Sequence, residues 1–399
     1  MGTTIDQSAA TLILIASAAF VLPLVGRRLR IPAVVLEIVF GVIIGPTTGW
    51  VEGTELLNQL GELGFFLLMF LSGFEIDLRT FERSGIGLVA TGLVVFGFTL
   101  VGSYFVAMSL GYGFFMTFVL ATTSVGVVVP TLRSTRRIST PLGQAILVSA
   151  LLADFLTLLG VTIFALIEEH GAGVQLLAVP GFFLAISVAL LALRRAAWWF
   201  PERFNRLFDQ DDPEELGIRA SLALMLVFVG LSTVLGIEPI LGAFLAGTIF
   251  ALVFRHRGAL EQKLSGFAYG FLIPIFFINV GIQFDLRALG EPGALTGAST
   301  LIGLALLVKL VPSLALLARR LSFKDVIAAG TLLSARLSLI IAVAELGVQL
   351  DVIDRALQAS IILLAAVTST FTPAIFRLIA PPLLVPSPGA DGADADTDS

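Results

Sequence analysis

The stretch AILVSALLADFLTLLG at residues 145–160 contains one charged residue, Asp154, within a run of apolar residues. With its apolar flanks this segment is long enough to cross a lipid bilayer as a single helix. A carboxylate near the middle of a bilayer costs at least about 2.5 kcal/mol, so such residues are rare and usually functional. Asp154 is therefore the first candidate for binding an ion or a proton. The alternative is a structural acid that pairs with a neighbouring helix.

The segment before Asp154 has a weak point in its helical pattern. Residues 121–130 read ATTSVGVVVP, and its hydroxyl, glycine and β-branched residues weaken a helix. Irregular backbone at membrane depth is tolerated where it lines a cavity or is buried in protein. Thr122, Thr123 and Ser124 are thus candidate ligands, because hydroxyl and carbonyl oxygens suit a hard cation. Ordinary hydrogen bonding between helices is the alternative role.

The composition is that of a membrane protein. Of the 399 residues, 57% are hydrophobic and 13% are charged, and the mean hydropathy is +1.00. Soluble domains carry about 25% charged residues. The chain has no cysteine and two histidines, which excludes disulfides and thiolate sites and argues against a histidine-rich metal centre. Because no nucleophile set or pair of catalytic acids is recognisable, we expect no enzyme, no cofactor and no nucleic-acid partner.

Hydrophobic segments recur along almost the whole chain. Thirteen are recognisable, at residues 8–26, 32–47, 56–76, 84–109, 113–131, 141–168, 174–196, 216–236, 238–254, 264–282, 294–318, 324–348 and 355–379. Several are short or interrupted by glycine and proline, which is usual in transporters. The sequence therefore predicts an all-α polytopic membrane protein with about thirteen transmembrane helices.

The distribution of basic residues predicts the orientation of these helices. If alternate loops face the cytoplasm, starting after the first segment, 20 of the 24 Lys and Arg residues lie on the cytoplasmic side and two lie outside. Cytoplasmic loops are rich in Lys and Arg. We therefore expect a multi-pass protein of the plasma membrane, with its N-terminus outside and its C-terminus in the cytoplasm. The remaining two basic residues, Lys309 and Arg336, fall within hydrophobic segments.

An internal repeat links the two halves of the chain. The motif GFEIDLR at residues 73–79 matches GIQFDLR at residues 281–287, 208 residues later. In the predicted topology the two motifs lie on opposite sides of the membrane, so segments 1–6 are repeated in inverted orientation as segments 8–13. Segment 7, residues 174–196, is then a linker helix. Inverted repeats are typical of alternating-access transporters, with gene duplication in a non-transporting protein as the alternative.

Three stretches resemble the cation:proton antiporter family, in particular its CPA2 branch of Na⁺/H⁺ exchangers and Kef-type K⁺/H⁺ antiporter membrane domains. They read LGELGFFLLMFLSGFEID at residues 60–77, LGAFLAG at residues 241–247 and IFFINVG at residues 275–281. Asp154 also follows a helix that contains Thr and Ser, as in the family. The resemblance spans about residues 10–380.

The resemblance implies a transporter domain over residues 1–380 in which helices 5 and 12 are discontinuous and cross. It implies two parts within this domain. A dimerisation part, residues 8–76 and 216–282, is expected to join a homodimer, and a core part, residues 84–168 and 294–379, is expected to move against it. Residues 381–399 are acidic and rich in small residues, so we expect a disordered tail.

The chain departs from the family pattern at three places. Helix 6 of the family often carries Asp-Asp or Asn-Asp, where this chain has Ala153 and Asp154. Helix 12 often carries Arg-Gly-Glu, where residues 334–338 read SARLS. Kef-type proteins continue into a soluble nucleotide-binding domain, for which we expect no counterpart.

The two intramembrane basic residues are expected to compensate charge where the broken helices cross. Lys309 lies in LALLVKLV at residues 304–311, where a lysine must be paired or neutral. The family resemblance places it near the acidic site, and its alternative partners are Asp154 and the C-terminal dipole of a half-helix. Both a fixed counter-charge and direct proton carriage are open. Arg336 lies where helix 12 is expected to unwind, and we expect it to compensate a half-helix C-terminus.

The leading hypothesis is a secondary antiporter that exchanges Na⁺ or K⁺ for H⁺ by alternating access. Asp154 would bind the cation and the proton competitively, because a buried carboxylate needs one or the other to neutralise it. The alternative is a gated monovalent cation channel, uniporter or K⁺ efflux pathway on the same fold. A channel favours several weak oxygen sites, whereas an exchanger needs one protonatable site. The sequence does not choose between Na⁺ and K⁺, because both take oxygen ligands.

Overall fold

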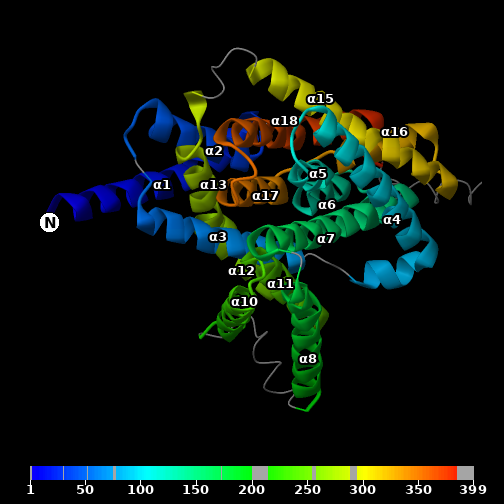
Figure 1. Ribbon diagram of the computed structural model, residues 1–399, viewed down its shortest axis with the longest axis horizontal. Helices are drawn as coiled ribbons and strands as arrows, with labels where there is room; N and C mark the ends of the chain where they lie inside the picture. The colour runs from blue at the N-terminus through cyan, green and yellow to red at the C-terminus, as the bar shows by residue number, and fades with distance from the viewer. Residues whose placement is uncertain are drawn as a thin grey trace, which may run out of the picture.

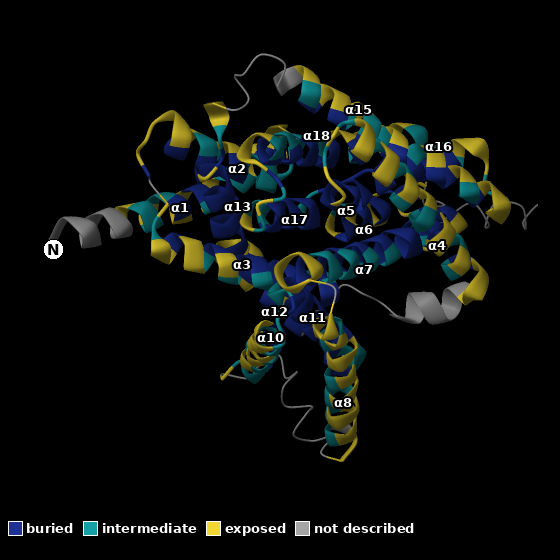
Figure 2. Cartoon of the chain, in the orientation of Figure 1, coloured by how far each residue is buried: buried dark blue, intermediate teal, exposed yellow. Residues whose placement is uncertain are grey.

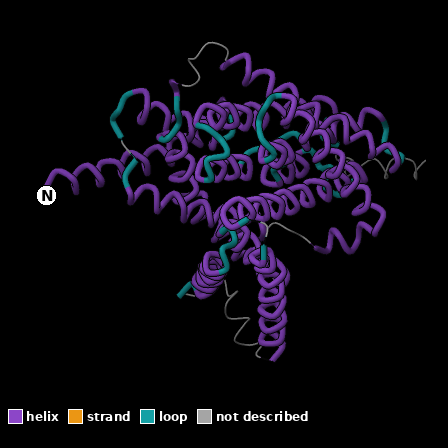
Figure 3. Tube along the Cα trace, viewed as in Figure 1, coloured by secondary structure: helices purple, strands orange, loops and turns teal. Residues whose placement is uncertain are grey.

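The computed structural model describes residues 2–29, 31–51, 53–74, 78–171, 173–199, 214–253, 258–287 and 294–383. Within these ranges the chain forms helices joined by loops, with no strand (Figure 3). The predicted all-α class is confirmed. Residues 75–77 of the first repeat motif lie outside the described residues, as does the predicted acidic tail from residue 384 onward.

The helices follow one another in two similar series (Figure 1). The first series is α1 (Gly2–Leu29), α2 (Ala33–Val42) with the π-helical turn η1 (Ile43–Thr47), α3 (Glu55–Phe74), α4 (Leu78–Ser109), α5 (Phe115–Ala121), α6 (Val125–Ser134) and α7 (Pro141–His170). The short turn η2 (Val174–Leu177) and α8 (Ala178–Trp199) cover the segment predicted as a linker, and this role remains a prediction. The second series is α10 (Leu216–Val234), α11 (Pro239–Val253), α12 (Gly258–Phe267), η3 (Ala268–Leu272), α13 (Ile273–Ile282), α15 (Ala294–Ser313), η4 (Leu314–Arg319), α16 (Phe323–Leu333), α17 (Ser338–Gln349) and α18 (Arg355–Ile379).

The number of membrane spans agrees with the sequence pattern. Among the described residues, ten helices are long and apolar enough to cross a membrane, and α5 with α6 counts as one of them. The pair α16 and α17, bent by 45° at its break, adds one more. Two shorter apolar helices, at residues 33–47 and 239–253, account for the rest of the thirteen predicted segments. The chain is thus a multi-pass membrane protein.

The predicted membrane segments 113–131 and 324–348 are broken at corresponding places in the two series. The first break, residues 122–124, separates α5 from α6, and the second, residues 334–337, separates α16 from α17. The backbone at Thr122 and Ser124 is extended rather than helical, with ψ of 152° and 108°. The Thr-Thr-Ser sequence gave the correct position for the first break, because such residues are weak helix formers.

Glycines at two helix crossings reveal the internal symmetry. A Cβ on Gly73 of α3 would collide with the carbonyl oxygen of Phe244 in α11. In the other half, a Cβ on Gly281 of α13 would collide with the carbonyl oxygen of Ile38 in α2. Small residues allow such close approach of helices in membranes. Gly73 and Gly281 are the first residues of the two repeat motifs, so each motif begins at an equivalent crossing in its own half.

The helices pack in two groups that meet near the breaks. In one group α3 packs on α11 and α13, α2 on α13, and α10 on α11; in the other, α4 packs on α7 and α15, and α16 on α15 and α18. Contacts of α3 with α17 and of α7 with α11 join the groups. Buried residues concentrate where α5, α6, α7 and α17 meet, whereas α8 projects away from this centre (Figure 2). The assignment of these groups as dimerisation and core parts remains a prediction.

Candidate cation site at the crossing of the two broken helices

Asp154 lies near the middle of α7 and faces the first break. Its side chain is 8% exposed, and its Oδ2 accepts a hydrogen bond of 3.3 Å from the backbone N–H of Val125. Val125 is the first residue of α6. The N-terminus of a helix carries partial positive charge and unsatisfied N–H groups, so it stabilises a carboxylate at this position.

The three hydroxyl residues of the break are all buried but differ in their contacts. The hydroxyl of Thr122 donates to the carbonyl of Val119 in its own helix, at 2.8 Å. The hydroxyl of Thr123 donates across the crossing to the carbonyl of Leu333, the last residue of α16, at 3.2 Å. The hydroxyl of Ser124 has no hydrogen-bond partner among the described residues. Of the three, Ser124 retains an oxygen for another ligand.

Lys309 lies at the C-terminal end of α5. Its ammonium donates to the carbonyl oxygen of Ala121 at 2.6 Å and to the hydroxyl oxygen of Thr123 at 2.8 Å. The side chain is 3% exposed. The C-terminus of a helix carries partial negative charge and unsatisfied carbonyls, which a cation stabilises. These contacts favour the half-helix end as the partner of Lys309, one of the two alternatives left open by the sequence.

Arg336 lies within the second break and is fully buried. Its guanidinium donates to the carbonyls of Leu120 in α5 and Ala305 in α15, at 2.8 and 3.0 Å, and more weakly to that of Ser334, at 3.4 Å. One planar fork therefore joins three segments by carbonyl contacts, which the geometry of Arg permits. The predicted position at a half-helix C-terminus agrees with these contacts; its part in transport remains a prediction.

The crossing separates positive and negative charge around α7. Lys309 and Arg336 lie at the C-terminal ends of the half-helices, where partial charge is negative, and Asp154 lies at an N-terminal end, where it is positive. Asp154, Lys309 and Arg336 each therefore lie at a complementary helix end. These positions offset part of the cost of burying the three charges without requiring them all to pair with one another.

Two small spaces, each with a volume of about 10 Å³, lie on different faces of α7. The first, the Asp154 space, is lined by Met69, Ser72, Asp154, Leu158, Phe244, Ser338 and Leu339. The second is lined by Val95, Phe96, Thr99, Thr123, Ser149, Ala153, Lys309 and Leu333. Ala153 thus faces the Lys309 side of α7, the side on which an acid at position 153 would lie.

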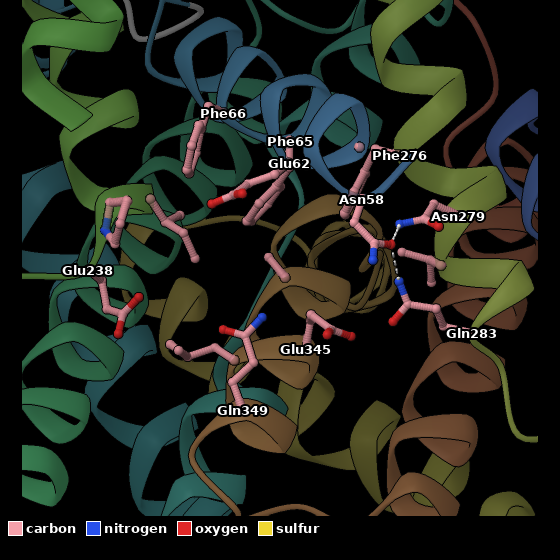
Figure 4. A pocket seen from close by; sticks show the side chains of 16 residues that line it. Asn58, Glu62, Phe65, Phe66, Glu238, Phe276, Asn279, Gln283, Glu345 and Gln349 are labelled. Atoms are coloured by element: carbon pink, nitrogen blue, oxygen red, sulfur yellow. Dashed lines mark hydrogen bonds between the residues drawn. The ribbon is translucent and has the colours of Figure 1, made fainter. Parts of the chain in front are cut away.

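A larger cavity of about 320 Å³, here named the α3–α17 cavity, opens between the two groups of helices (Figure 4). Its wall contains the carboxyl groups of Glu62 in α3, Glu238 before α11 and Glu345 in α17. Asn58, Asn279 and Gln283 form a hydrogen-bonded group on another part of the wall, in which Asn58 Oδ1 accepts from both neighbours at 3.1 and 3.2 Å. Stacked aromatic rings of Phe65 and Phe276, with centroids 4.9 Å apart, cover the apolar part.

The carboxyl groups of the α3–α17 cavity are held in different ways. Glu345 accepts a hydrogen bond of 2.7 Å from the amide of Gln358, whose own oxygen accepts one of 3.2 Å from Arg355. At Glu238, which lies in the loop before α11, burial raises the pKa to about 7, and the nearby negative charge of Glu169 adds to this rise. Sequence reasoning missed this cavity, because its three glutamates lie on segments that are far apart in the chain.

Comparison with known proteins shows the family of the chain. Residues 15–380 match the family model described as the transmembrane sodium/hydrogen exchanger. The chain belongs to this sodium/hydrogen exchanger family. The membership in the cation:proton antiporters that the motifs predicted is therefore confirmed.

Relatives in this family carry antiporter names. The putative Na⁺/H⁺ antiporter YjbQ of Bacillus subtilis is 36% identical over 93% of the chain, which spans 63% of the length of that protein. The Na⁺/H⁺-K⁺ antiporter GerN of Bacillus cereus is 30% identical over 88% of the chain and 90% of its own length. The solved sodium proton antiporter MjNhaP1 of Methanocaldococcus jannaschii shares the fold, with a TM-score of 0.66, 16% identity, and coverage of 94% of this chain and 98% of that one.

Proposed function

We propose that the protein is a secondary antiporter that exchanges a monovalent cation for a proton, with Asp154 as the group that binds both. The observation that carries the proposal is the burial of Asp154 at the N-terminus of α6, where the broken helix leaves backbone groups beside it. Membership of the sodium/hydrogen exchanger family supports the same conclusion.

Competition at one carboxylate is sufficient to couple the two ions. An ionised Asp154 in an apolar surrounding requires a cation, whereas a protonated Asp154 is neutral and requires none. Asp154 without a cation or a proton is the state of highest free energy. The core part would therefore move between its two positions when Asp154 holds a cation or a proton, and rarely when it holds neither. Exchange follows from this difference in free energy.

Several features support the membrane arrangement. We propose that the N-terminus lies outside and the C-terminus in the cytoplasm, which the distribution of basic residues in the loops supports. In this topology the α3–α17 cavity faces outside, and its three glutamates attract cations toward the entrance. We further propose a homodimer in the plasma membrane joined through the dimerisation part, against which the core part moves.

A channel on the same fold is the less favoured alternative. A conducting pore needs a continuous path with several weak sites. The spaces on either side of α7 each have a volume of only about 10 Å³, so passage requires a movement of the helices. The named relatives are antiporters, which also favours exchange.

The proposal is tested by replacing Asp154 in proteoliposomes that contain a pH-sensitive dye. Addition of Na⁺, K⁺ or Li⁺ to the wild-type protein should drive proton flux, and Asp154→Asn should abolish it while the protein still folds. Asp351→Asn is the matched control, because Asp351 is exposed and adopts a left-handed conformation (φ of 56°) that Asn tolerates. Normal cation-driven flux in Asp154→Asn would refute the assignment, and the cation panel decides between Na⁺ and K⁺.

A further inference from the structure

The Asp154 space lies in line with the α3–α17 cavity along one face of α3. Asn58, Glu62 and Phe65 line the cavity, and Met69 and Ser72 line the Asp154 space. These residues are spaced by four, three, four and three positions, which is the spacing of a single helix face. Ser72 is thus about 15 Å further along the helix than Glu62, at 1.5 Å per residue.

The same relationship holds on α17, which faces α3 across the cavity. Gln349, Glu345 and Ala342 line the cavity, and Ser338 lines the Asp154 space. The intervals are four, three and four residues, again one face of a helix. The Asp154 space is therefore the inner end of the same interface between the two groups of helices, and Asp154 approaches it from α7.

The size and lining of this space suit one small ligand. A volume of about 10 Å³ on this measure corresponds to about one water molecule. The polar residues that line it are Asp154, Ser72 and Ser338. A dehydrated monovalent cation takes several oxygen ligands, and a carboxylate alone does not supply them.

Two of the three hydroxyl groups that the sequence predicts as cation ligands take part in other hydrogen bonds. Those of Thr122 and Thr123 donate to backbone carbonyls, and Thr123 also accepts from Lys309. Ser338 is the first residue of α17, so its backbone N–H also points out of a helix N-terminus toward the break.

We propose that Ser72 and Ser338 are cation ligands that complete the coordination of the ion at Asp154. This inference rests on the proposed function of Asp154 and adds a ligand from each group of helices. Ser338 is in the core part and travels with Asp154, whereas Ser72 is on α3 in the dimerisation part and stays behind. Ser72 therefore contacts the cation only in the state that opens toward the α3–α17 cavity, and Ser338 contacts it in both states.

The test measures the KM for Na⁺ from each side of the membrane, with right-side-out and everted vesicles. Ser338→Ala should raise the KM about tenfold from both sides, which is the order expected for loss of one hydrogen-bonding ligand of a charged group. Ser72→Ala should raise it about tenfold from outside and leave it unchanged from inside. Ser→Thr at each position keeps a hydroxyl and should restore most of the affinity. Ser17→Ala is the control, because Ser17 is exposed and bonds its own helix.

The outcomes separate this inference from the proposed function. If Asp154→Asn abolishes exchange but both alanine variants keep the wild-type KM from both sides, the ligand assignment is wrong and the role of Asp154 stands. If Ser72→Ala changes the KM equally from both sides, its state-specific contact is refuted. If Asp154→Asn still exchanges ions, the proposed function itself fails.

A second measurement covers the case in which an alanine variant does not fold. The chain contains no cysteine, so Ser72→Cys or Ser338→Cys introduces a single thiol. Ag⁺, a small monovalent thiol reagent, should inactivate both variants in chloride-free buffer, and Na⁺ should slow the inactivation at least tenfold. Adding Asp154→Asn to either variant should remove this protection in a direct assay of thiol labelling. Labelling that is insensitive to Na⁺ would overturn the proposal.

Discussion

The ammonium group of Lys309 lies 2.6 Å from the carbonyl oxygen of Ala121, the last residue of the half-helix α5. The same ammonium donates to Thr123, whose hydroxyl hydrogen is directed to the carbonyl of Leu333 at the end of α16. One cation thus stabilises both half-helix ends, the first directly and the second through a hydroxyl group. This arrangement explains how two helices can end inside the membrane, where water does not satisfy their carbonyl groups.

Replacing Lys309 with Met should destabilise the crossing, because it leaves the Ala121 carbonyl and the α5 dipole without their cation. A loss of about 2–3 kcal/mol is expected for a buried hydrogen bond to a charged group. Denaturation of the detergent-solubilised protein measures the loss. Lys324→Met, at an exposed position, is the control and should cost much less. Equal losses in the two variants would show that Lys309 does not stabilise the half-helix end.

The hydroxyls of Thr122 and Thr123 allow a matched comparison, because both are fully buried and adjacent. Thr123→Val removes the bridge between Lys309 and Leu333, so we expect a loss of about 1–3 kcal/mol in the free energy of unfolding. Thr122→Val removes a bond to its own helix only and should cost less. The reverse order would contradict the bridging role of Thr123.

The crossing was predicted from the sequence more completely than its surroundings. Asp154, the weak helix at residues 122–124 and the two intramembrane basic residues are local exceptions within apolar runs, so the sequence pattern identifies them. The partner of Arg336 was not predictable, because Leu120 and Ala305 offer backbone carbonyls, which every residue has. The α3–α17 cavity also escaped prediction, since its wall depends on how distant segments pack.

The position of Ser72 beside Asp154 was likewise not predictable from the sequence. It lies within an apolar stretch of α3, and a serine there is ordinary in helix packing. Its place beside Asp154 becomes visible only when α3, α7 and α17 are brought together. The spacing from Glu62 to Ser72 along one helix face is the only sign of this position in the sequence.

The pH dependence of outer cation affinity should depend on Glu238. Because its pKa is about 7, this carboxyl is mostly neutral below pH 6 and mostly charged above pH 8. Its negative charge, added to those of Glu62 and Glu345, should lower the KM for external Na⁺ as pH rises through 7. The proposed competition at Asp154 would also lower the KM with rising pH. The wild type is therefore compared with Glu238→Gln, whose KM should depend less steeply on pH.

Salt distinguishes this long-range attraction from direct binding. Charges about 10 Å apart are largely screened at 0.1 M ionic strength and much less at 0.01 M. The KM difference between wild type and Glu238→Gln at pH 8 should therefore shrink when an impermeant salt is added. A difference that persists unchanged in high salt would indicate that Glu238 contacts the cation directly.

Exchange should be electroneutral. The ammonium group of Lys309 donates to the carbonyl of Ala121 at the C-terminal end of α5, whose partial negative charge complements it. The prediction holds if Lys309 keeps its proton throughout the cycle. With Ala153 on the Lys309 side of α7, Asp154 is the remaining carboxylate of the family's acidic pair. In the proposed function it exchanges one proton for one monovalent cation. Each half-cycle then carries the same charge, so a membrane potential does no net work on the exchange.

A K⁺/valinomycin potential imposed on proteoliposomes checks this prediction, with Na⁺ as the transported ion. A cycle that moves one net charge would gain or lose about 2.3 kcal/mol per 100 mV, which changes the driving force clearly. We expect the rate of dye-reported proton flux to remain constant between 0 and 100 mV. A rate that follows the voltage would contradict electroneutrality. In that case Lys309→Arg, which cannot release its proton, should abolish the voltage dependence if Lys309 is the second proton carrier.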